Sequence, residues 1–157
     1  MRDDDNLIKR EFVLRLSLND AWELLSKIEK WRTWAPHVKS VEMDPVGDIK
    51  VNSTCTIMFN SGLKMSYKIT EVNAQKNWKW EASILWYDIF CDHKFMYMDK
   101  EHTKISWLVD CEGFGSAIFG FLFSYFHSRK LNVAIPNLIA EVNRSYLKGR
   151  KTASQQE

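Results

Sequence analysis

Residues 114–148 constrain the fold most, because they form the longest stretch of the chain with no turn signal other than Pro136. Ser116 is a suitable N-cap and Gly149 is a suitable residue just beyond a helix end, so the stretch predicts one long helix. At about 1.5 Å per residue, that helix would be roughly 45–50 Å long. Pro136 lacks the backbone N–H that the preceding turn needs, so we expect a kink or break at Ala134–Pro136.

Upstream of this helix, the chain alternates between apolar and polar residues, as strands with one buried face do. We expect strands at residues 7–16, 37–44, 49–59, 63–73, 77–85, 87–98 and 103–111. Helical spacing after a capping-box start at Ser17 predicts a short helix to Glu29, and Lys30–Trp34 predicts a second helical turn. The short connections favour antiparallel neighbours, so the order predicts an α+β fold in which a curved antiparallel sheet of about seven strands wraps around the long C-terminal helix.

Three local segments resemble a known superfamily. Ser17–Leu25 leads from a small polar start to an aromatic residue, Trp31–Val41 contains Trp-x-x-Trp followed by Pro and Val, and Thr103–Trp107 has the pattern of a last strand before Gly113. Together they resemble the START-like superfamily, also called SRPBCC or helix-grip proteins, and within it the polyketide cyclase/dehydrase and lipid-transport branch. The resemblance covers residues 7–148. It implies a groove between helix and sheet that binds lipids, sterols, polyketides or other apolar molecules, and some members are cyclases.

Composition and motifs argue against several other classes. The net charge is only +2, and the lysines alternate with strand interiors, so we expect no nucleic-acid partner. Four histidines and three cysteines lack metal-ligand spacing, and no Gly-rich phosphate loop is present, so no metal or cofactor is expected. The N-terminus does not have the pattern of a signal peptide, which predicts a cytoplasmic protein with free thiols. We expect a single domain over residues 1–157, with flexible tails at 1–6 and 150–157.

Aromatic residues make up 13% of the chain, and such rings both fill cores and line concave apolar sites. The candidate ligand contacts are large side chains on the expected inner faces and on the start of the long helix: Trp34, Phe59, Met65, Tyr67, Trp80, Tyr87, His93, Phe95, Trp107, Ile118, Phe121, Leu122 and Tyr125. The face of strand 87–98 that carries Tyr87, His93 and Tyr97 is the more apolar one and is expected to point inward. His93 with Tyr97 would be the acid–base pair if the protein were an enzyme, and a structural core histidine is the alternative.

Residues 117–126 are apolar almost all round, and a helix of that kind must be covered or must meet something apolar. A ligand entrance, a dimer contact, a lip that touches a membrane transiently and simple burial by loops all remain open. The sequence therefore predicts a carrier or sensor of a hydrophobic or amphipathic small molecule, as a monomer or homodimer. A polyketide cyclase/aromatase-type enzyme and a protein- or membrane-interaction module are the alternatives.

Overall fold

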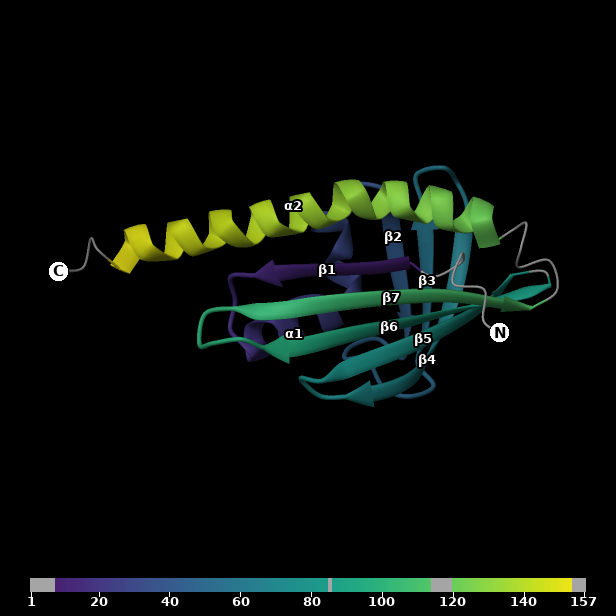
Figure 1. Ribbon diagram of the computed structural model, residues 1–157, viewed down its shortest axis with the longest axis horizontal. Helices are drawn as coiled ribbons and strands as arrows, with labels where there is room; N and C mark the ends of the chain where they lie inside the picture. Colours follow the sequence, from purple (N-terminus) through teal and green to yellow (C-terminus); the bar gives the residue numbers. More distant parts are fainter. Residues whose placement is uncertain (1–7, 85, 114–119, 154–157) are drawn as a thin grey trace.

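A computed structural model describes residues 8–84, 86–113 and 120–153. Its strands are β1 (Ile8–Leu14), β2 (Val38–Asp44), β3 (Thr54–Phe59), β4 (Lys64–Asn73), β5 (Asn77–Ile84), β6 (Tyr87–Tyr97) and β7 (Thr103–Gly113). They form one antiparallel sheet in the order β1-β7-β6-β5-β4-β3-β2. The helices are α1 (Leu18–Ser26), the 3₁₀ helix η2 (Ile28–Thr33) and α2 (Phe121–Ala153). Figure 1 shows the curved sheet with α2 lying along β1, which confirms the predicted α+β helix-grip fold.

Local patterns explain most of these elements. In β4, Met65, Tyr67 and Ile69 are buried while the residues between them are exposed, as the alternating sequence predicts. At the start of α1, the Ser17 hydroxyl accepts a hydrogen bond from the backbone N–H of Asp20 at 3.2 Å and donates to the Asp20 carboxylate at 2.7 Å. This closes the predicted cap, in which the side chain satisfies one of the free N–H groups of the first turn.

The third strand is shorter than its sequence pattern predicts. It begins at Thr54 rather than Ile49, because the chain first makes a turn in which the backbone N–H of Ser53 bonds to the carbonyl oxygen of Lys50 at 3.0 Å. Asn52 in that turn has a positive φ of 70°, a left-handed conformation that asparagine tolerates better than most residues. Alternation of side chains alone does not reveal such a turn.

The long helix differs from its prediction at its end, and it does not break at its proline. α2 continues past Gly149 to Ala153, and it runs through Pro136 without a break. Pro136 has no backbone N–H to donate to the carbonyl oxygen of Asn132, four residues earlier. Both residues are exposed, so water can donate to that carbonyl instead. Buried side chains on both sides of the proline hold the helix to the sheet: Leu131, Ala134, Leu138 and Val142. The expected N-cap, Ser116, lies outside the described residues, and no helix in the described ranges is long and apolar enough to cross a membrane.

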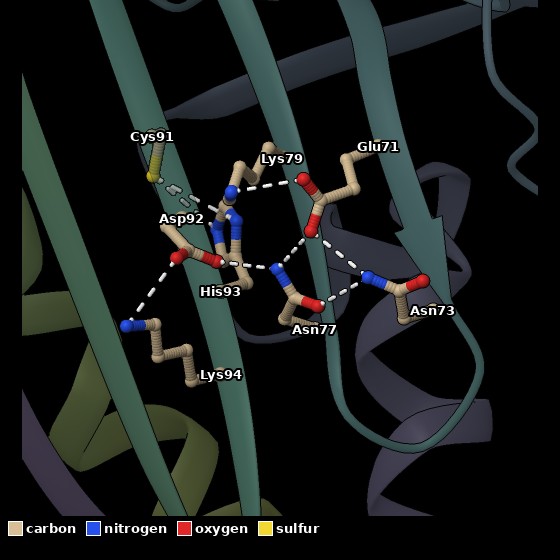
Figure 2. Close-up of polar contacts among 8 residues, drawn as sticks. All are labelled: Glu71, Asn73, Asn77, Lys79, Cys91, Asp92, His93 and Lys94. Carbon is tan, nitrogen blue, oxygen red and sulfur yellow. Dashed lines mark hydrogen bonds and ion pairs between the residues drawn. The ribbon is translucent and has the colours of Figure 1, made fainter.

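A polar network on one face of the sheet fixes how β4, β5 and β6 lie against each other (Figure 2). The Asn77 amide donates to Glu71 at 2.8 Å and to Asp92 at 3.1 Å, and the Lys79 ammonium lies 2.9 Å from the second Glu71 carboxylate oxygen. Lys79 pairs with Asp92 across the two strands, and the next pair along is Trp78 with His93. Because side chains alternate between faces, this register places Trp78 and His93 together on the opposite, buried face.

Candidate ligand-binding site

An interior cavity of about 70 Å³ lies against the inner face of the sheet, between η2 and α2. Strand residues from β3 to β7 form one side of the wall, and Leu131 and Ala134 of α2 close the other. Several of the predicted ligand contacts line this cavity: Trp34, Phe59, Tyr67, Trp80, His93 and Trp107. The cavity therefore lies where the sequence placed a ligand, between the sheet and the long helix.

Other predicted contacts are buried in the core but lie outside the cavity wall. Phe95 packs edge-on against Trp22 of α1, with 5.1 Å between ring centroids. Met65 accepts a weak hydrogen bond from the Tyr67 hydroxyl at 3.7 Å, and Tyr87 is buried near the far end of β6. These three side chains stabilise the fold around the cavity rather than forming its surface.

The remaining predicted contacts do not face the interior. Tyr97 is 64% exposed, so its expected inward position is wrong: the cover that α1 provides over β6 ends near Phe95. Phe121, Leu122 and Tyr125 are 64%, 45% and 50% exposed on α2, and Ile118 lies outside the described residues. Phe121 and Tyr125 instead border a more open groove between β1 and α2.

Sequence reasoning missed several wall residues. Trp78 lies two residues before Trp80 in the expected strand 77–85, so strand alternation could have identified it. His127 recurs at helical spacing with Leu131 and Ala134, a stripe that continues across Pro136 and could also have been recognised. Trp31, His37, Cys55 and Cys91 also line the cavity. Strand alternation places Cys91 on the face of His93 and Cys55 on the face of Phe59, whereas no strand pattern singles out Trp31 or His37.

Aromatic rings dominate the cavity wall. The His93 and Trp78 rings stack with centroids 4.0 Å apart and an interplanar angle of 4°. The Trp31 ring of η2 lies 5.5 Å from Trp34, 6.0 Å from Trp78, 5.9 Å from His93 and 6.5 Å from Trp107, centroid to centroid. The Trp31 indole N–H donates to the carbonyl oxygen of Leu25 at 3.0 Å. This bond anchors the central ring, so η2 positions the cluster.

Three indole donors in this wall have no partner. The Nε1 atoms of Trp34, Trp78 and Trp107 are buried and lack a hydrogen-bond acceptor within the described residues. The Nδ1 atom of His37 is in the same situation. A buried donor without an acceptor costs about 1–3 kcal/mol. The wall therefore combines an apolar surface with donors that a bound molecule could satisfy.

Ionisable groups in the cavity are neutral at pH 7. Burial, with a smaller contribution from His127, lowers the pKa of His93 to about 3. Burial and the nearby Lys130 ammonium lower the pKa of His127 to about 3 and that of His37 to about 4. Burial also raises the pKa of the Cys55 thiol to about 12 and raises the pKa of Tyr67. Since the described residues of the wall include no Asp, Glu, Lys or Arg, this part of the wall is uncharged.

The Cys91 sulfur lies 3.7 Å from Nδ1 and 3.8 Å from Nε2 of the His93 ring (Figure 2). Burial raises the pKa of this thiol well above its ordinary value, so it is a thiol and not a nucleophilic thiolate. Within the described ranges, no group of three or more His, Cys, Asp or Glu side chains is placed to hold a metal ion. The wall is suited to holding an apolar molecule in contact with its rings.

An antiparallel sheet around a long helix, with an apolar cavity between them, defines a helix-grip protein of the START-like superfamily. The family described as polyketide cyclase / dehydrase and lipid transport matches residues 8–135. The chain belongs to that family. No curated protein sequence matches it.

Solved structures with this fold share little sequence with the chain. A START superfamily protein from Mycobacterium smegmatis is 10% identical with a TM-score of 0.70, over 88% of this chain and 97% of that one. Norcoclaurine synthase from Thalictrum flavum, in complex with dopamine and hydroxybenzaldehyde, is 17% identical with a TM-score of 0.62, over 86% of each chain. The di-domain ARO/CYC protein BexL from the BE-7585A biosynthetic pathway is 10% identical with a TM-score of 0.68, over 88% of this chain and 46% of that one. Identities this low establish a shared fold and no shared activity.

Proposed function

We propose that the protein binds a hydrophobic or amphipathic small molecule in the cavity between sheet and α2, and acts as a carrier or sensor. The observation that supports this most is the cavity wall itself, whose described residues are largely aromatic and include no ionised side chain. Apolar walls with a few placed polar groups are typical of small-molecule sites. The family description, which includes lipid transport, agrees with a binding function.

The size of the cavity limits what fits without movement of α2. A volume of about 70 Å³ is roughly twice the share of one water molecule in the liquid, about 30 Å³, and roughly half of a cavity of about 150 Å³ that binds benzene. Even a compact molecule with one or two fused rings therefore needs the cavity to widen, and such a molecule needs the least widening. A longer lipid would have to displace Leu131 and Ala134, the α2 residues that close the wall.

A cyclase-type enzyme is the second function to weigh, because His93 is a neutral imidazole in the cavity wall. Its low pKa makes it a weak base, since general bases work best with a pKa near the operating pH. The tyrosine expected to assist it, Tyr97, is on the surface. Both observations favour binding over turnover.

Filling the cavity tests the proposal. Ala134 is 1% exposed and lines the wall, whereas Ala140 is an exposed residue on the same helix. Ala134→Leu should fill part of the cavity and weaken binding of a bicyclic hydrocarbon such as tetralin at least tenfold, measured by quenching of tryptophan fluorescence. Ala140→Leu makes the same change on the solvent side and should bind like the wild type. Because overpacking costs about 1–3 kcal/mol, thermal melts must show that both variants remain folded.

Equal tetralin affinity in Ala134→Leu and the wild type would place the binding site elsewhere. The same experiment distinguishes binding in the cavity from the alternative in which the protein is an interaction module. If the ligand bound at the exposed face of α2 instead, Phe121→Ala and Tyr125→Ala would weaken binding and Ala134→Leu would not.

A further inference from the structure

The unpartnered indole donors point to the kind of ligand, and this inference rests on the proposed binding function. Trp34, Trp78 and Trp107 come from three different parts of the chain, yet each ring lies within 6.5 Å of the Trp31 ring, centroid to centroid. Each carries a buried Nε1–H without an acceptor in the described part of the chain. Proteins rarely leave buried donors unsatisfied, and one such group is unusual enough to need a reason. Three around one cavity indicate a place for an acceptor.

We propose that Trp34, Trp78 and Trp107 form a donor subsite that selects an uncharged ring compound with an oxygen acceptor, such as a ketone, over both its hydrocarbon and its carboxylate counterparts. A carbonyl oxygen has two lone pairs and accepts from two N–H groups at once. Indole is only a donor, so the three tryptophans give the subsite a one-sided preference for acceptors.

The surrounding groups favour a neutral acceptor over an anion. The wall residues that the structure describes include no cation, and their histidines are neutral, so a carboxylate would lose its hydration without gaining a charged partner among them. A cation does lie beside the wall: the Lys130 ammonium is 4.1 Å from the centroid of the Phe59 ring, which lines the cavity. After burial, which is the larger cause, its charge further lowers the pKa of His37 and of His127. If Lys130 did anchor an acid group, a carboxylate would bind more tightly than the ketone, which the test distinguishes.

The test compares three molecules of one skeleton: tetralin, 1-tetralone and 1,2,3,4-tetrahydro-1-naphthoate. Wild-type protein should bind 1-tetralone about tenfold more tightly than tetralin, a factor equivalent to about 1.4 kcal/mol, and should bind the carboxylate more weakly than either. Dissociation constants are measured by calorimetry at pH 7 with the full chain.

Tryptophan-to-phenylalanine variants identify the donors. Trp34→Phe, Trp78→Phe and Trp107→Phe each remove an N–H and keep an aromatic ring, so at least one should lower the ratio of ketone to hydrocarbon affinity about tenfold. Trp80→Phe is the matched control, because Trp80 lines the same cavity but its indole nitrogen is not among the buried, unpartnered donors. It should leave the ratio unchanged. Tetralin binding by each variant shows that the cavity is intact, so a variant that fails to fold is recognised.

Two results would overturn the donor subsite but not the proposed function. One is an unchanged ratio of ketone to hydrocarbon affinity in all three variants, and the other is a carboxylate affinity equal to or above that of the ketone. In both cases tetralin still binds, and the proposed function stands. If none of the three molecules bound the wild type, the proposed function of the cavity would fail with it.

Discussion

Acid should destabilise this protein through a buried histidine. His93 is 4% exposed and stacks on Trp78, and its pKa in the folded protein is about 3, against the ordinary 6.5. Between those two values the unfolded chain binds a proton that the folded protein does not bind. Stability therefore rises with pH across this window, and it is lost as the pH falls below about 6.5.

The magnitude follows from the two pKa values. Between pH 7 and pH 5, protonation of His93 in the unfolded chain removes about 2 kcal/mol from the free energy of unfolding. The groups that face His93 are the Cys91 thiol, which is neutral at these pH values, and His127, whose low pKa adds a loss of the same sign. His37, near His127 and Lys130, contributes in the same direction.

The variant His93→Gln isolates the contribution of His93. Urea unfolding at pH 7, 6 and 5, followed by circular dichroism, should show that wild type loses about 2 kcal/mol more over this range than the variant does. His127 and His37 titrate in both proteins, so their contribution cancels in the difference. His102→Gln is the control, because His102 lies at the exposed turn between β6 and β7. This variant keeps His93 and should therefore lose as much stability between pH 7 and pH 5 as the wild type. The same loss of stability in wild type and His93→Gln would refute the reasoning.

Two further predictions concern the fold around the cavity. Gly113 and Gly47 both have a positive φ, 120° and 118° respectively. A Cβ added at Gly113 would lie 2.7 Å from the Trp86 carbonyl oxygen, whereas a Cβ added at Gly47 would have no atom within 4 Å. Gly113→Ala should therefore destabilise by about 1–3 kcal/mol more than Gly47→Ala in urea unfolding, and equal losses would contradict the clash. Burial raises the pKa of Cys55 to about 12 and also raises the pKa of Cys91. Neither thiol should therefore react with iodoacetamide at pH 8 until the protein unfolds, which peptide mass spectrometry can follow. Rapid labelling of the native protein would contradict this prediction.

The sequence predicts the strands and their faces well, because alternation is a local property. In β5, the inward positions of Trp78, Trp80 and Ala82 follow from the period of two and are all buried. The cap at Ser17 is equally local. These elements needed no knowledge of the rest of the chain.

Features that depend on distant contacts could not be predicted in this way. The helix α2 passes through Pro136 because Leu131, Ala134 and Leu138 hold it to the sheet on both sides, a tertiary effect that outweighs the local cost of about 3 kcal/mol. The cavity likewise depends on the pairing of Trp78 with His93 across β5 and β6, and on η2 bringing Trp31 over both rings. Tyr97 shows the opposite error: its position fits the period of the inward face, but among the described residues it is 64% exposed at the end of β6.

Indole resonances in a ¹⁵N–¹H spectrum test most directly whether the cavity is a binding site, with assignments from the tryptophan variants. As 1-tetralone is added, the signals of Trp34, Trp78 and Trp107 should shift saturably, with one dissociation constant, because these donors line the site. The signal of Trp86, which is 62% exposed and outside the cavity wall, should stay in place. Unmoved cavity signals, or shifts that grow linearly and equally at all tryptophans, would contradict the claim that the protein holds a small molecule between its sheet and α2.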